Sequence, residues 1–225
     1  IGFSLRSIFI KYPFEILKYI FTKTGLFTST IAEAGGFIRS RGDVEVPDIQ
    51  LHFAPAMLVD HGRTNLWGHG LSCHSCLLRP KSRGEVTLNS ADPMDDPKID
   101  PKFLSHPDDM KVMIDGYKKM MKIMNTEPFS KYTSKHVIRP VDLSDDADIE
   151  QAIREGADTV YHPVGTCMMG NNDMSVVDSS LKVHKMKSLR VVDASIMPTL
   201  VGGNTNAPTM MIGEKAADLI LDDWC

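Results

Sequence analysis

The feature that most constrains the fold is a strand–loop–helix pattern in residues 191–221, VVDASIMPTLVGGNTNAPTMMIGEKAADLIL. A buried apolar strand over 189–192 is predicted to end at Asp193, and a Gly-rich loop with two asparagines follows it. An Ala-rich helix is predicted from about Pro208 to 221, because proline suits the first helical turn. In open α/β sheets, ligands bind beyond the carboxyl ends of the strands. The pattern therefore indicates part of an α/β ligand-binding unit.

The start of this predicted helix presents N–H groups that have no partner within the helix, together with the positive end of the helix dipole. Such an end favours an anion, or a carbonyl oxygen that gains negative charge during a reaction. From these residues alone, a purely structural interpretation stays equally open, in which the asparagines only satisfy backbone groups.

A second stretch with residues suited to catalysis is TVYHPVGTCMMG, residues 159–170. Pro163 keeps His162 out of helical geometry, and Gly165 allows a tight turn or a close approach to a ligand. A histidine held on a loop in this way can accept a proton near neutral pH. A single His–Pro pair is a weak signal, however, so a purely structural role for His162 also stays open.

Composition places the chain among ordinary globular proteins. It has 225 residues, of which 42% are hydrophobic and 24% charged, enough for a core in one or two domains. The net charge of −4, without a basic stripe, argues against nucleic-acid binding. Charged residues and Pro13 interrupt the apolar stretch 8–27, so no membrane span is predicted. The chain begins with Ile1 and contains no Gly-rich phosphate loop, which predicts a piece of a longer protein.

The four cysteines are too few for a disulfide scaffold. The stretch GHGLSCHSC places His69, Cys73, His74 and Cys76 at metal-like spacing, but no second ligand pair follows it. We therefore predict no metal site, and an incidental loop or a local disulfide is the favoured interpretation. In the predicted strand PDIQLHFAP, His52 lies on the face opposite the apolar residues, where it faces either solvent or a cavity.

The remaining pattern predicts a mixture of helices and short strands. Helical structure is predicted over 1–35, up to the Gly35–Gly36 pair, and a strand over 36–40. A hairpin is predicted between 77–79 and 85–88, followed by irregular chain rich in Pro and Asp. Asp108 is predicted to cap a helix with a methionine stripe, and a second, acidic-capped helix is predicted to stop at Gly156.

Three linked motifs, YHPVGTCMMG, VVDSSLKVHKMKSLRVVDASIMPT and GGNTNAPTMMIGEKAADLI, resemble the C-terminal part of the glucose–methanol–choline (GMC) flavin oxidoreductases. The segments PDIQLHFAP and LLRPKSRGEVTLNSADPMDDPKIDPKFLSHPDD resemble the same family. The resemblance covers nearly the whole chain, in the family's order. The sequences of these motifs are most similar to those of the animal glucose-dehydrogenase-like members.

The resemblance implies an α/β fold with two parts. Residues 1–158 correspond to part of a substrate-binding domain, with a large, mostly antiparallel sheet and helices. Residues 159–225 correspond to the strand–loop–helix return segment of a Rossmann-like FAD-binding domain. The family's GxGxxG unit belongs to a missing N-terminal half. We therefore expect the 225 residues alone to bind FAD poorly and to be inactive.

The resemblance also implies site residues. His162 matches the active-site histidine that faces the flavin, and Asn204 matches the second active-site position. Asp193 and Ala194 match the strand end that contacts FAD. The segment beside the pyrimidine edge of the flavin is matched by Asn206, Pro208 and Thr209. His162 would take the hydroxyl proton of an alcohol or sugar while hydride moves to flavin N5, and the helix dipole would stabilise charge at N1 and the C2 carbonyl.

The expected partners are an alcohol or sugar substrate, quinone or oxygen as the electron acceptor, and the missing half of the protein. The family resemblance favours a secreted protein. A non-catalytic GMC-like flavoprotein or binding protein is the alternative, and a small metal or redox module is a third. Neither the substrate nor the choice between oxidase and dehydrogenase follows from the sequence.

Overall fold

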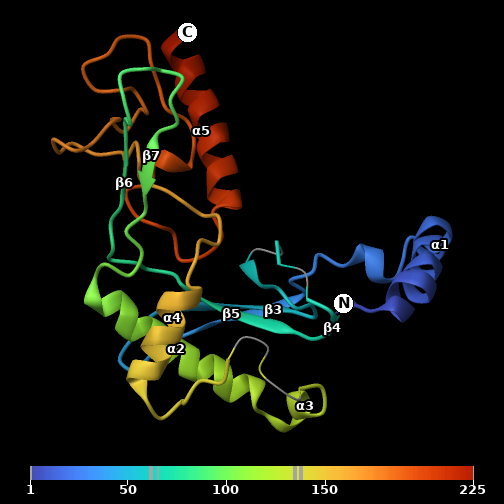
Figure 1. Ribbon diagram of the computed structural model, residues 1–225. Coiled ribbons are helices and arrows are strands. Elements are labelled where there is room, and N and C mark those ends of the chain that lie inside the picture. Colours follow the sequence, from blue (N-terminus) through green and yellow to red (C-terminus); the bar gives the residue numbers. More distant parts are fainter. Residues whose placement is uncertain (1, 61–62, 65, 134–135, 137–138, 225) are drawn as a thin grey trace. The chain divides into compact units, whose positions relative to one another are not determined.

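The computed structural model describes residues 2–60, 63–64, 66–133, 136 and 139–224 (Figure 1). The fold is α/β, with helices and small antiparallel sheets. The chain divides into two compact units. The first unit comprises Ile1–Cys76 and Val112–Glu155, and the second comprises Leu77–Lys111 and Gly156–Cys225. The assignment of 1–158 to substrate binding and 159–225 to FAD binding stays a prediction.

A three-stranded sheet in the order β2-β3-β5 organises the first unit (Figure 1). Its strands are β2 (Ala34–Ile38), β3 (Ile49–Ala54) and β5 (Ser72–Leu77). The antiparallel register of β2 and β3 places Gly36 opposite Leu51. A two-stranded pair joins β1 (Gly2–Phe3) to β4 (Gly68–His69). The alternation predicted for 49–53 is confirmed at the buried side chains of Ile49 and Leu51.

Helices α2 (Pro107–Met124), α3 (Glu127–Ser130) and α4 (Asp146–Gly156) complete the first unit, although α2 begins in the second. The methionine stripe of α2 is confirmed as core, because Met110 is buried and both Met113 and Met121 pack against the cluster that contains Ile49 and Leu51. The predicted end of α4 at Gly156 is also confirmed. Asp108 lies inside α2 and pairs with lysine side chains, so its predicted capping role is wrong.

The N-terminal region is helical only in part. It contains η1 (Ser7–Lys11), α1 (Tyr12–Thr22) and η2 (Leu26–Thr28). Lys23 ends α1 in the left-handed conformation, with φ of 55°, and the Gly35–Gly36 pair lies in β2 rather than at a helix end. No side chain of α1 is buried, and most of its large apolar side chains are exposed. The helix therefore offers a broad apolar face.

In the second unit, the predicted hairpin is wrong. Strand β6 (Glu85–Thr87) pairs with β7 (Lys98–Asp100), within the stretch predicted to be irregular, and not with 77–79. The glycine at position 84 permits this pairing. A Cβ atom there would lie 2.3 Å from the Asp100 carbonyl oxygen, so only glycine allows the two chains to approach this closely.

The predicted strand 189–192 is not formed. Only an isolated bridge between Lys182 and Arg190 is present there, and Leu189 is exposed. A strand requires a neighbouring backbone along its length. Here the Leu189 carbonyl accepts from the Val183 N–H at 2.9 Å and the Val191 N–H donates to the Leu181 carbonyl at 3.2 Å, which together make a single bridge around Arg190 among the described residues. A 3₁₀ turn, η4 (Ala194–Ile196), follows, and α5 spans Asn206–Trp224, so it begins two residues before the predicted Pro208.

The core of the second unit holds these segments together. Its buried members are Val177, Leu181, Ile196, Met197, Ile212 and Ala216. Ile196 and Met197 come from the turn after Asp193, whereas Ile212 and Ala216 come from α5. The apolar contacts therefore fix the turn against the helix, and burial of such side chains contributes about 1.5–3 kcal/mol each.

The three cysteines among the described residues form no disulfide. Cys73, Cys76 and Cys167 are free thiols, which excludes the local disulfide considered above. Burial, with a smaller contribution from Cys73, raises the pKa of Cys76 to about 11, so this thiol stays protonated near neutral pH. Within the described residues, no group of three or more His, Cys, Asp or Glu side chains could hold a metal ion. None of the described helices is long and apolar enough to cross a bilayer.

A buried carboxylate anchors the start of α2 in the second unit. Asp109 is only 2% exposed, and it accepts hydrogen bonds from the backbone N–H groups of Lys81 and Ser82, both at 2.8 Å. The Ser82 hydroxyl donates to it at 2.6 Å. Burial opposes ionisation of Asp109, but these three donors outweigh it, and the pKa of Asp109 lies below its ordinary value of 3.8.

Replacing Asp109 with asparagine is expected to lower the free energy of unfolding by about 1–3 kcal/mol, because an amide NH₂ would then face hydrogen-bond donors. Urea denaturation measures this loss, and exposed Asp108→Asn is the matched control with a much smaller effect. The folded pKa is the lower one, so the carboxylate stabilises fully above the unfolded pKa and progressively less as pH falls towards the folded value. Equal stability of the two variants at neutral pH would contradict this assignment.

Candidate active site

His162 lies on a loop whose backbone is tightly constrained. Tyr161 before it and Gly165 after it both have positive φ, of 65° and 91°. Further along, the Cys167 N–H donates to the Ser195 carbonyl at 3.0 Å, and the Met169 N–H donates to the Ile196 carbonyl at 2.8 Å. The loop is thereby tied to the turn that follows Asp193.

Both ring nitrogens of His162 contact residues that lie more than forty positions further along the sequence. Nε2 lies 3.0 Å from Nδ2 of Asn204, and Nδ1 lies 2.8 Å from the hydroxyl oxygen of Thr205. The backbone N–H of Thr205 also approaches Nδ1, at 3.4 Å. The structure therefore brings the two predicted catalytic residues, His162 and Asn204, into direct contact.

The predicted cofactor-binding residues lie on the segments that flank this contact. Asp193 is exposed and its Oδ1 accepts from the Ser195 N–H at 2.7 Å, which caps η4 (Ala194–Ile196). Asn206, Pro208 and Thr209 form the first turn of α5, and the Thr209 hydroxyl donates to the Thr205 carbonyl at 2.7 Å. The two segments share one core, through Ile196 and Ile212.

Thr205 is the site residue that sequence analysis missed. It is only 7% exposed, whereas Asn204 beside it is exposed. The Thr209 N–H donates to its carbonyl at 3.0 Å, so Thr205 is the residue immediately before α5. Threonine is a preferred residue at that position, and this preference is the signal that could have drawn attention to it.

This arrangement can act on a polar group that approaches His162. Nε2 is directed towards the exposed Asn204 side chain, so an imidazole base and a carboxamide lie together at one place. At the start of α5, the N–H groups of Asn206 and Ala207 precede the first helical hydrogen bond and both residues are exposed. A ligand with carbonyl oxygens finds hydrogen-bond donors at this end of the helix.

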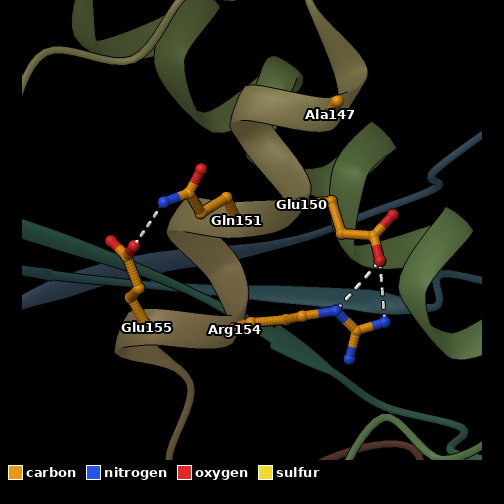
Figure 2. Close-up of a pocket in the computed structure, with 5 residues that line it drawn as sticks. All are labelled: Ala147, Glu150, Gln151, Arg154 and Glu155. Atoms are coloured by element: carbon orange, nitrogen blue, oxygen red, sulfur yellow. Dashed lines mark hydrogen bonds and ion pairs between the residues drawn. The ribbon is translucent and has the colours of Figure 1, made fainter.

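A shallow depression on α4 is a weaker candidate (Figure 2). All the side chains that line it come from that single helix, and its four polar side chains pair with one another. Arg154 contacts Glu150 at 2.7 Å and Gln151 donates to Glu155 at 2.8 Å, as Figure 2 shows. Such pairs four residues apart are typical of a solvated helix face. The contact of His162 with Asn204 and Thr205 is therefore the candidate active site.

Comparisons with known proteins identify the family of the chain. A family model described as GMC oxidoreductase matches residues 80–213, which include His162 and Asn204. An alcohol dehydrogenase (acceptor) from Pseudomonas putida is 48% identical over 206 residues, covering 92% of this chain and 37% of the relative. An oxygen-dependent choline dehydrogenase from Klebsiella pneumoniae is 42% identical over 203 residues, covering 90% and 37%.

Among solved structures, formate oxidase from Aspergillus oryzae, studied for modification of its FAD, superimposes with a TM-score of 0.86 at 28% identity. The match covers 95% of this chain and 42% of that one. The chain thus spans well under half the length of the relatives it matches. The match of the family model over more than half of its residues shows that the chain belongs to the GMC oxidoreductases.

Proposed function

We propose that this chain is the C-terminal part of an FAD-dependent oxidoreductase that oxidises the CH–OH group of an alcohol or sugar. The observation that carries the proposal is the position of His162, with Nε2 at the exposed Asn204 side chain and Nδ1 at the Thr205 hydroxyl. This half-buried imidazole has one nitrogen held by Thr205 and the other directed at an exposed polar side chain, an arrangement suited to a general base.

The reaction requires a proton acceptor and a group that holds the substrate oxygen. An alcohol gives up hydride from carbon only when its hydroxyl proton can leave, and Nε2 of neutral His162 takes that proton. Asn204 holds the substrate oxygen with its amide, a neutral group that offers no second base. The Asn204 amide contacts Nε2 in this structure. The hydroxyl of a bound substrate would lie between these two groups and contact both.

The same end of the unit suits FAD, which supplies the hydride acceptor when it is bound. The start of α5 offers the N–H groups of Asn206 and Ala207 to a carbonyl edge, and its dipole favours negative charge there. Pro208 and Thr209 continue this turn. Asp193 and Ala194, at η4, are the residues we assign to a second contact with the cofactor.

The substrate class is drawn from the relatives. The Pseudomonas and Klebsiella proteins are named for the oxidation of an alcohol and of choline, so a small hydroxyl compound is the proposed substrate, with quinone or oxygen as acceptor. The stronger likeness to animal glucose dehydrogenases stays a prediction, since the relatives described here are bacterial and fungal. Within this proposal, residues 159–225 serve the FAD domain and residues 1–158 the substrate domain.

The test is anaerobic reduction of the flavin in a protein that contains this chain and the family's N-terminal part. Addition of a primary alcohol is expected to bleach the yellow flavin absorbance, whereas the 225 residues alone should bind FAD poorly and show no turnover. A flavin that stays oxidised with primary alcohols, secondary alcohols, choline and sugars would favour the non-catalytic flavoprotein instead. Turnover by the isolated chain would contradict the proposed dependence on the missing part.

A further inference from the structure

The contacts around Nδ1 of His162 hold information about the position of the ring proton. Two groups of Thr205 face this nitrogen, the hydroxyl at 2.8 Å and the backbone N–H at 3.4 Å. A backbone N–H can only donate, so its contact requires Nδ1 without a proton. A hydroxyl can donate or accept, so it is compatible with either form of the ring.

If the hydroxyl accepts, it requires a proton on Nδ1, whereas the backbone N–H requires Nδ1 without one. The two contacts then favour opposite tautomers. The hydroxyl contact is the shorter one, and the amide contact is long for an N–H···N hydrogen bond. On the other side of the ring, Asn204 presents its Nδ2, a donor, to Nε2 at 3.0 Å. A donor at Nε2 requires an unprotonated Nε2, which places the proton of the neutral ring on Nδ1.

We infer that the hydroxyl of Thr205 is a positioning group, which accepts the Nδ1–H of His162 and so keeps Nε2 free as the base. The inference rests on the proposed function, because it explains how His162 would perform that role. Which imidazole nitrogen is available is set by the hydrogen bond that the other nitrogen makes. Of the two groups that face Nδ1, only the hydroxyl can accept this proton.

Burial makes the hydroxyl difficult to replace by water. Thr205 is 7% exposed, and two hydrogen bonds from Thr209 to its carbonyl fix it at the start of α5. Valine has nearly the same shape and lacks the hydroxyl. With valine at 205, the backbone N–H is the remaining described partner of Nδ1, and it can only donate. The Asn204 amide can rotate to present its oxygen to a protonated Nε2, whereas the backbone N–H cannot accept from Nδ1. The ring proton is therefore expected to move to Nε2, where it blocks acceptance of the substrate proton.

The same hydroxyl has a role after proton transfer. When Nε2 takes the substrate proton, both ring nitrogens carry hydrogen, and Nδ1–H needs an acceptor within reach. The Thr205 oxygen is that acceptor, whereas the backbone N–H would oppose it. The hydroxyl therefore supports both the neutral ring that accepts the proton and the cation that holds it.

The direct test is the tautomer of His162 in the 225-residue chain. Two-bond ¹H–¹⁵N spectra of the neutral ring distinguish protonated from unprotonated nitrogens, and the His162→Gln variant identifies the signals. We expect the proton on Nδ1 in the unchanged chain and in Thr205→Ser, and on Nε2 in Thr205→Val. A proton on Nε2 in the unchanged chain, or on Nδ1 in Thr205→Val, would overturn the inference.

The second readout is the rate of flavin reduction by alcohol in the flavin-loaded protein that carries this chain. Thr205→Val is expected to lower this rate about 10–100-fold, by analogy with the loss of hydrogen-bond partners that orient metal-bound histidines. Thr205→Ser should stay within a few-fold of the unchanged protein. If Thr205→Val moves the proton without slowing reduction, the positioning role is wrong. Undiminished reduction in His162→Gln would instead refute the proposed base, so the two failures are distinguishable.

Discussion

Replacing His162 with glutamine is expected to lower the rate of flavin reduction by alcohol about 10²–10⁴-fold, the range over which a general base accelerates proton transfer. Glutamine keeps hydrogen-bonding groups near Asn204 and Thr205 but cannot take a proton at neutral pH. The loss should therefore fall on the chemical step, and binding of FAD and substrate should change little. Anaerobic stopped-flow measurement of flavin absorbance separates these two effects.

The matched control is His184→Gln. His184 lies in the same unit and also makes a hydrogen bond, between its Nε2 and the Gly170 carbonyl at 2.9 Å, but has no place in the proposed chemistry. Its replacement is expected to leave the rate of flavin reduction unchanged. Equal rates for His162→Gln and the unchanged protein would remove His162 from the mechanism.

The largest effect on stability is expected from Gly35→Ala in β2. A Cβ at Gly35 would lie 2.3 Å from the Leu51 carbonyl oxygen, far inside van der Waals contact, and this oxygen belongs to the neighbouring strand. The clash can be relieved only by moving β2 away from β3. Because overpacking of this kind costs about 1–3 kcal/mol, we expect a loss of at least that size in the free energy of unfolding.

Gly36→Ala is the control for this prediction, since it makes the same chemical change one residue further along the same strand. A Cβ at Gly36 would meet no atom within 4 Å. Alanine is favoured over glycine within a strand by roughly 0.5–1 kcal/mol, so Gly36→Ala should be neutral or stabilising. Urea denaturation of both variants measures the difference, and equal midpoints would show that β2 and β3 are not in this register.

Local patterns predicted the elements whose core contacts repeat along one helix or strand. The spacing of Met113 and Met121 predicted the core-facing side of α2, and the alternation of Ile49 and Leu51 predicted β3. Patterns failed where the partner lies further along the chain. The sequence around Glu85 does not specify that its strand pairs with residues 98–100, because a glycine at 84 permits a close approach without naming the partner.

In the candidate site, too, local patterns predict less where a residue's role depends on a distant partner. The His–Pro pair before Gly165 gave only a weak local signal for His162. The pairing of His162 with Asn204 was predicted through the family resemblance. Thr205 was missed because the role of its hydroxyl depends on a contact with a histidine 43 positions away, which the local sequence does not predict. The predicted strand 189–192 failed for a related reason, since strand formation depends on backbone partners that the sequence of the strand does not specify.

Helix α1 has a practical consequence for handling the chain. Phe9, just before the helix, is 73% exposed, and Phe14 and Phe21 on it are 64% and 80% exposed. So many bare aromatic rings on one short segment favour adsorption to plastic and clustering of molecules at high concentration. A mild nonionic detergent, which shields such rings reversibly, should keep purified samples monodisperse and sharpen every spectrum recorded from them.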